Sequence, residues 1–116
     1  VGARFADYLT SVAFRTPSLA YLPNRLAELI EAPEPARMVE LLSTHVHKPV
    51  LWRRSVDLVL ERWHDATLVE VGPRTVLYNL LDRKWHRGVS KRHTDTLEDS
   101  ATHLAQLIEE LSCSKT

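Results

Sequence analysis

The sequence predicts an α/β fold, and the order of three neighbouring segments carries that prediction. An amphipathic segment over residues 52–63 is followed by the β-branched run Thr67–Val71, by a Gly-Pro corner, and by a second amphipathic segment that begins at Val76. The apolar spacing changes from about four residues to a continuous run and back again, which indicates a helix, a strand and a helix. Helices and strands that alternate along a chain are typical of a layered α/β structure.

Apolar residues at helical spacing predict five helices in all. Pro at position 17, Pro at position 49 and Gly at position 88 are expected to interrupt them, because neither residue type continues a helix well. The expected ranges are residues 2–13, 52–63, 76–85 and 94–112, the last being an amphipathic helix near the C-terminus. A further helix is expected after the turn at residues 32–35, with proline in its first turn, and it should stop before Pro49.

Strands are predicted with less regular patterns. Thr67–Val71 is the clearest, because it is short, apolar and rich in β-branched residues. Residues 18–22 and 89–93 are also compatible with short strands, the second at a sheet edge, whereas residues 25–31 fit either a helical turn or a strand. Glu70 is the only charged residue in Thr67–Val71, and such a strand is usually covered on both faces, as in a parallel sheet. One or two strands are not stable alone, so we expect residues outside this chain to complete the sheet.

Composition and charge exclude several classes of protein. The chain has 116 residues, 44% hydrophobic and 26% charged, with a formal net charge of zero, so it is expected to be globular and to lack the basic surface of a nucleic-acid binder. We expect no membrane span, because no apolar run approaches the required ~20 residues. The single cysteine, Cys113, excludes an internal disulfide and fits a reducing, cytoplasmic location.

Four motifs in a fixed order carry a resemblance to a known family. They are Leu9–Phe14 with Pro17 and Asn24, Leu41-Leu42 with Pro49-Val50-Leu51-Trp52, Val69-Glu70-Val71-Gly72-Pro73, and Val76-Leu77. In this order and at this spacing they resemble the C-terminal part of malonyl-CoA:acyl-carrier-protein transacylases and of the related acyltransferase domains of polyketide synthases. The resemblance covers about residues 3–85.

The resemblance implies that residues 1–116 form part of an acyltransferase domain. The fold would be the mostly helical C-terminal part of its α/β-hydrolase-like large subdomain. Such an enzyme moves a malonyl-type acyl group from coenzyme A to an acyl carrier protein through an acyl-serine, in fatty acid or polyketide biosynthesis. Its Ser stands in a Gly-x-Ser-x-Gly elbow and is activated by a His. The only glycines here are Gly2, Gly72 and Gly88, so the elbow is not in this chain, and the His would precede Val1. We expect the chain alone to be inactive.

The resemblance also assigns roles to individual residues. In the bacterial enzymes, the residue four before the Pro of the Pro-Val-x-Trp motif orients the catalytic His through its backbone carbonyl, and here that residue is His45, where those enzymes often have Gln. Asn24 would support the floor of the active site, although a turn-forming Asn fits equally well. The remaining motif residues are expected to be structural: Pro49, Trp52, Glu70, Gly72 and Pro73.

Two positions near the Gly-Pro corner leave alternatives open. Glu70 could act as a general acid or base, but a structural role, either in capping backbone amides or in pairing with Arg74, fits better. Arg74 stands where many relatives have Gly, and Arg rarely adopts the positive φ that Gly allows. The local backbone is therefore in question.

The sequence also leads to expectations about partner proteins, metals and cofactors. Arg83, Lys84 and Arg87 belong to a basic cluster that could dock an acidic carrier protein, bind RNA, or simply be a solvated helix end. No metal is expected at His45 and His47, because residues two apart face different sides of a helix. We expect no cofactor to be bound by this segment, with malonyl-CoA as the substrate of the whole enzyme. The upstream part of the same acyltransferase is an expected partner. The alternative function is a non-catalytic lobe that docks an acyl carrier protein or a synthase partner.

Overall fold

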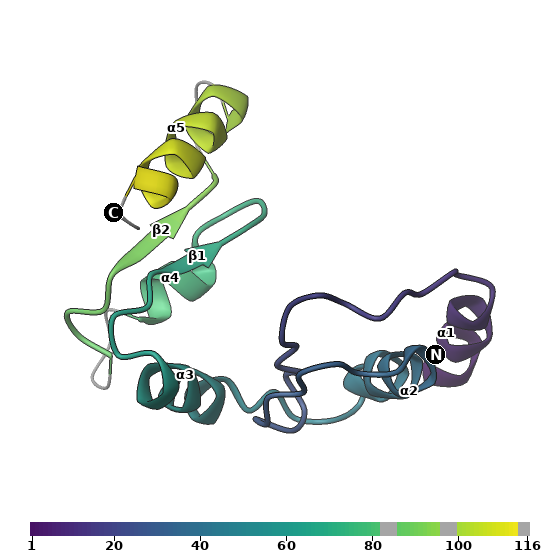
Figure 1. Cartoon of the computed structure of the whole chain (residues 1–116). Helices are drawn as coiled ribbons and strands as arrows, with labels where there is room; N and C mark the ends of the chain where they lie inside the picture. Colours follow the sequence, from purple (N-terminus) through teal and green to yellow (C-terminus); the bar gives the residue numbers. More distant parts are fainter. Residues whose placement is uncertain (82–85, 96–99, 114–116) are drawn as a thin grey trace. The chain divides into compact units, whose positions relative to one another are not determined.

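The computed structural model describes residues 1–81, 86–95 and 100–113 (Figure 1). Within these residues the protein is a mixed α/β structure with five helices and one two-stranded parallel sheet, which confirms the α/β prediction. The chain divides into two compact units, Val1–His64 and Asp65–Thr116. Each unit is described by itself below.

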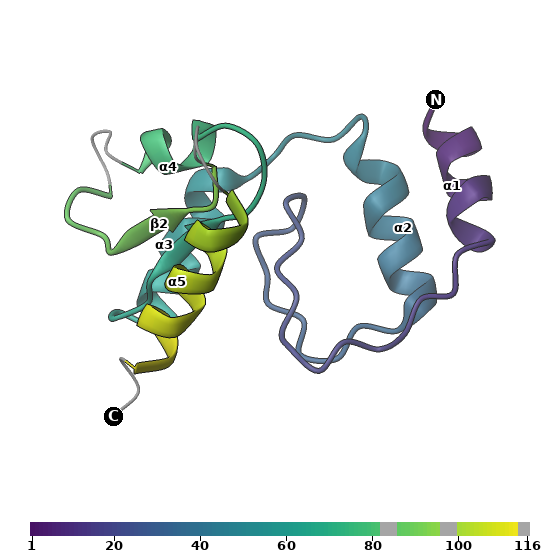
Figure 2. The same ribbon diagram turned by 90° about the horizontal axis from the view of Figure 1, so that it is seen from above.

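The first unit contains α1 (Gly2–Thr10), α2 (Pro35–His45) and α3 (Trp52–Arg62). Helices α1 and α2 lie side by side in both views (Figure 1, Figure 2). They run antiparallel, since a Cβ on Gly2 would lie 3.3 Å from the carbonyl oxygen of Ser43, near the end of α2. Leu9 and Leu41 are buried, with 7% and 2% of their surface exposed.

Helix α1 ends three residues earlier than its apolar spacing predicts. The Thr10 hydroxyl donates to the carbonyl of Asp7 at 2.7 Å, and the Ser11 hydroxyl donates to the carbonyl of Tyr8 at 2.6 Å. The Thr10 hydroxyl supplies a donor to the Asp7 carbonyl, and the Ser11 hydroxyl adds a second bond to the Tyr8 carbonyl, which also accepts from the Ser11 amide at 3.0 Å. Such side-chain bonds to the last carbonyls allow the helix to end there.

The segment between α1 and α2 contains a single antiparallel bridge, Tyr21 with Ile30, in place of a strand over residues 18–22. Each of the two backbone amides donates to the other residue's carbonyl at 2.9 Å. Pro23 has no N–H to extend the ladder. Residues 25–31 form neither a helix nor a longer strand, and Ala27 adopts a φ of 51° in the turn.

The second unit contains β1 (Leu68–Glu70), α4 (Val76–Leu80), β2 (Lys91–His93) and α5 (Ser100–Cys113). Strands β1 and β2 are parallel, with Leu68 opposite Lys91 and Glu70 opposite His93, and α4 contacts both strands (Figure 1). The predicted parallel strand and edge strand therefore pair with each other.

Two helix boundaries in this unit fall partly outside the described residues. Residues 82–85, the end of the predicted fourth helix, and residues 96–99, near the start of the predicted fifth, are not among them. Thr94 and Asp95 are not helical: the Thr94 amide donates to the Glu70 carbonyl at 3.0 Å, and an Asp95 oxygen accepts from the Arg74 amide at 2.7 Å. These bonds continue the strand pairing past β2, and they hold both residues out of α5.

Of the described helices, none combines the length and the apolar character that a membrane crossing requires.

Candidate functional site

Asn24 and His45, two residues that the sequence singled out, line the same pocket of the first unit. The pocket has a volume of about 350 Å³. Phe5 of α1 contributes to one wall, residues 21–25 to another, and the last turns of α2 to a third. The lining therefore comes from three segments that are far apart in the sequence.

The carbonyl of His45 has no helical hydrogen-bond partner, because the residue four positions later, Pro49, cannot donate one. In an α-helix each carbonyl accepts from the amide four residues ahead, and for His45 that residue is Pro49, which has no N–H. Among the described residues the His45 carbonyl accepts no hydrogen bond. A backbone acceptor is thus available beside the pocket, whatever the side chain at position 45.

Asn24 is connected to the Pro-Val-Leu-Trp segment by a backbone hydrogen bond. The amide of Leu51 donates to the carbonyl of Asn24 at 2.8 Å. Leu51 is the residue before α3, and Trp52 is the first residue of that helix, where it is half-buried. Two of the motifs that were separate in the sequence are therefore joined in this unit, and Pro49 is exposed between them.

Arg25 also lines this pocket, and no pattern in the sequence indicated it. Its Nη1 donates to the Thr44 hydroxyl at 2.7 Å and lies 3.6 Å from a carboxylate oxygen of Glu40. Glu40 also accepts a hydrogen bond from Arg37, and this bond is the main reason that the pKa of Glu40 is lowered. Burial raises the pKa of Tyr21, another lining residue.

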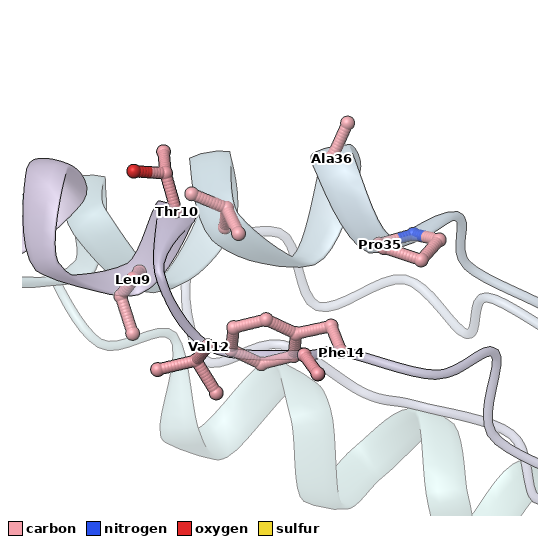
Figure 3. A pocket seen from close by; sticks show the side chains of 8 residues that line it. Leu9, Thr10, Val12, Phe14, Pro35 and Ala36 are labelled. Atoms are coloured by element: carbon pink, nitrogen blue, oxygen red, sulfur yellow. The ribbon is translucent and has the colours of Figure 1, made fainter.

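A second pocket of the first unit lies at the other end of the helix pair (Figure 3). It has a volume of about 460 Å³ and is lined by the C-terminal end of α1, the residues just after it, and the first turns of α2. Its lining is apolar except for Thr10: Leu9, Val12, Ala13, Phe14, Pro35, Ala36 and Val39. Nothing in this lining is suited to acid–base or nucleophilic chemistry.

In the second unit, Glu70 caps the first turn of α4. Its two carboxylate oxygens accept from the amides of Leu77 at 3.1 Å and Tyr78 at 2.8 Å. These amides are among those that an α-helix leaves unpaired at its start. Of the two structural roles considered, amide capping is the one observed, and within the described residues no ion pair joins Glu70 to Arg74.

The Gly-Pro corner keeps a backbone suited to glycine although Arg74 follows it. Arg74 has a φ of 72°, and Gly72 has a φ of 141°. The Gly72 amide donates to the Thr94 hydroxyl at 3.1 Å, and the Arg74 amide donates to Asp95. Pro73 is exposed. Arg74 therefore adopts the positive φ that usually favours glycine, although it has a side chain.

The basic residues considered for carrier docking fall mostly outside the described part of the chain. Arg83 and Lys84 are not among the described residues. Arg87 is described, and it is exposed in a turn that also contains Gly88, whose φ is 84°.

A cluster of titratable side chains that the sequence did not indicate connects α4, β2 and α5. The Lys91 ammonium lies 3.9 Å from the centre of the Tyr78 ring, and His93 meets that ring edge-on at 4.8 Å. The Nε2 atom of His103 lies 2.8 Å from the His93 carbonyl oxygen. Through these contacts the cluster packs the three elements against one another. The described residues include no group of side chains that could hold a metal ion.

The chain was compared with protein-family models, with curated proteins and with solved structures, and none of these comparisons found a match.

Proposed function

We propose that this chain is the C-terminal segment of an acyltransferase that moves a malonyl-type acyl group from coenzyme A to the phosphopantetheine thiol of an acyl carrier protein. The observation that carries the proposal is the free carbonyl of His45, four residues before Pro49, in a pocket that Asn24 also lines. In this proposal the chain folds as part of the α/β-hydrolase-like large subdomain of the acyltransferase. The whole enzyme would work in the cytoplasm.

The direction of α1 supports this role for His45. Gly2 lies against the carbonyl of Ser43 and near the ring of His47, at 3.3 and 3.6 Å from the position of an added Cβ. Any residue before Val1 would therefore enter α1 beside the end of α2 that contains His45. A catalytic His at that position could donate its Nδ1–H to the His45 carbonyl, which would fix its tautomer and direct Nε2 toward a serine.

The chemistry of the whole enzyme would then follow in two halves. The serine oxygen attacks the thioester carbonyl while the catalytic His takes its proton, and the thiol of coenzyme A leaves with that proton. The carrier's thiol next attacks the acyl-serine ester and gives its proton to the same His, which passes the proton to the serine oxygen as the acyl–oxygen bond breaks. The contribution of this chain is to orient the His and to support it.

The second unit supports the proposal through its corner and its sheet. Arg74 has a φ of 72°, a backbone conformation that Gly favours, which agrees with the Gly that many of the acyltransferases have at this position. The sheet has two described strands, whereas sheets in globular proteins usually have about four to six. In the proposed enzyme, strands from other residues would complete it.

The test uses the protein as its source cells make it. The intact mass and N-terminal sequence are measured first, and the protein is then incubated with malonyl-CoA and weighed again. We expect a larger protein that gains one malonyl group on a serine, and Ser→Ala at that elbow should abolish the gain. Equal acylation of the Ser→Ala variant, or a natural protein of 13.3 kDa that begins at Val1, would contradict the proposal.

Pro49→Ala tests the role of the His45 carbonyl in the same enzyme. The substitution supplies an amide four residues after His45, which can compete for the carbonyl, so we expect acyl transfer to slow by roughly tenfold to a hundredfold through misorientation of the base. Val50→Ala is the matched control, because Val50 is 52% exposed and its amide is unchanged. An unchanged rate in Pro49→Ala would remove the proposed role.

A non-catalytic lobe that docks an acyl carrier protein or a synthase partner is the second candidate. The apolar pocket beside α1 and α2 favours it, because an open apolar surface is a common feature of protein-binding sites (Figure 3). This candidate predicts that the 116-residue chain binds a carrier protein by itself and that no acyl-enzyme forms. Acylation of the natural protein, with no carrier binding by the chain alone, would contradict it.

A further inference from the structure

The pocket that Asn24 and His45 line also contains a charged side chain with unused hydrogen-bonding capacity. Of the residues that line it, Arg25 is the one that is permanently charged, and its side chain is only 26% exposed. A guanidinium carries five N–H donors in a planar fork. Only Nη1 of Arg25 is engaged, with Thr44 and near Glu40, and within the described residues Nε and Nη2 have no hydrogen-bond partner.

The local charge balance leaves Arg25 attractive to an anion. Glu40 is the carboxylate nearest to Arg25, at 3.6 Å, but it is also bonded to Arg37, which is its main partner. Two guanidinium groups therefore share one carboxylate, so one positive charge remains uncompensated in this group. A bound carboxylate would supply the missing negative charge and two acceptor oxygens.

The rest of the lining selects the kind of molecule that carries the carboxylate. Phe5, Leu22, Pro23, Leu41 and Leu42 give the pocket a mainly apolar wall. Its volume of about 350 Å³ is within the range of small-molecule sites, which combine apolar walls with a few polar groups that fix orientation. Such a wall excludes a strongly hydrated ion and suits a short hydrocarbon body.

We propose that this pocket binds a small carboxylic acid with an apolar body, and that Arg25 holds the carboxylate through its Nε and Nη2 fork. Thr44 keeps the guanidinium in position by occupying Nη1. Bidentate pairing of this kind is stronger and more selective in geometry than contact with a point charge. This inference goes beyond the proposed function, since it requires neither an acyl-serine nor any residue outside the chain.

The test is a titration of the isotopically labelled full chain with sodium octanoate, followed by NMR. Octan-1-ol is titrated in parallel, because it has the same hydrocarbon body without the charge. We expect saturable shifts at residues 21–25 and 41–46 with octanoate, and binding at least about tenfold weaker with the alcohol, since a hydrogen bond to a charged group contributes more than a neutral one.

Three variants separate the fork from general charge effects. Arg25→Gln should weaken octanoate binding about tenfold, and Arg25→Lys should weaken it as well, because an ammonium cannot pair in a bidentate manner. Arg54→Gln is the matched control: Arg54 is exposed and does not line the pocket, so binding should remain within about twofold. Equal affinity for octanoate and octanol, unchanged binding in Arg25→Gln, or no saturable binding to the wild-type chain would each overturn the proposal.

Discussion

Replacing Glu70 with Ala should destabilise the second unit through the first turn of α4. The carboxylate accepts from the amides of Leu77 and Tyr78 at 3.1 and 2.8 Å. Leu77 is 38% exposed, so its amide can bind water after the substitution, whereas the Tyr78 amide is half-buried and is harder to solvate. The loss of one partly buried, charge-assisted hydrogen bond is expected to cost about 1–2 kcal/mol, similar to the loss of a helix N-cap.

The assay is urea unfolding of the labelled full chain, with NMR signals of β1 and β2 reporting on the second unit and signals of α1 and α2 reporting on the first. With a urea dependence of about 1 kcal/mol per molar for a small unit, the midpoint of β1 and β2 should fall by about 1–2 M, while that of α1 and α2 should not change. Glu70→Gln keeps one acceptor oxygen without the charge, so it should lose about half as much.

Glu109→Ala is the control, because Glu109 is exposed on α5 and its side chain makes no hydrogen bond or ion pair with the described residues. If Glu70→Ala and Glu109→Ala shift the midpoint equally, the capping bonds contribute nothing measurable and the reasoning is refuted.

Three further predictions concern the core, the Gly-Pro corner and one carboxyl group. Leu41 is 2% exposed and Leu19 is 77% exposed. Leu41→Ala should therefore lower the free energy of unfolding of the first unit by about 3 kcal/mol through lost burial and a cavity, whereas Leu19→Ala should change it by less than about 0.5 kcal/mol. Equal effects of the two substitutions in urea unfolding would contradict the assigned core. Arg74 has a φ of 72°. Arg74→Gly should therefore stabilise the second unit by about 0.5–1 kcal/mol, because it relieves the backbone strain of a left-handed residue with a Cβ, and Arg74→Ala, which keeps the Cβ, should not stabilise it. Destabilisation by Gly would show that the backbone at this corner is unstrained. Hydrogen bonding to Arg37 lowers the pKa of Glu40 from its usual 4.5, so the stability that this contact contributes is present above pH 4.5 and is lost as the pH falls through the lowered pKa. An NMR titration of the side-chain carboxyl should show this, and Arg37→Gln should return the pKa toward its usual value; no change in that variant would exclude Arg37 as the cause.

Local sequence determined much of the secondary structure in this chain. The stripe that begins at Trp52 gave α3, and the β-branched run around Val69 gave β1, because each periodicity is a local property that one backbone conformation satisfies. Proline and serine or threonine positions also mark the ends of helices, although the sequence placed the end of α1 too late. That error arose because apolar spacing continues past Thr10, while the hydroxyls of Thr10 and Ser11 already bond to the last carbonyls.

The availability of the His45 carbonyl lies partly in the sequence, because Pro49 cannot supply a helical amide; the end of α2 at His45 also leaves its last carbonyls without intrahelical donors. Its pocket does not lie in the sequence. The contact between Arg25 and Thr44 joins residues nineteen apart, and nothing in the pattern around Arg25 distinguishes it from the other arginines. The cluster of Tyr78, Lys91, His93 and His103 is likewise formed by the pairing of β2 with β1 and by the placement of α5.

The sequence by itself therefore determined where the main helices and the strand β1 lie, but not their exact ends or the bridge between Tyr21 and Ile30, since apolar spacing acts between residues that are near one another in the chain. It also determined that Glu70 stands alone as a carboxylate in an apolar strand. Only the tertiary structure decided what that carboxylate does, because the amides of Leu77 and Tyr78 reach it after the Gly-Pro corner has turned the chain back. The tertiary structure also placed Asn24, Arg25 and His45 around one pocket, because such contacts depend on packing between distant segments, which no local pattern specifies.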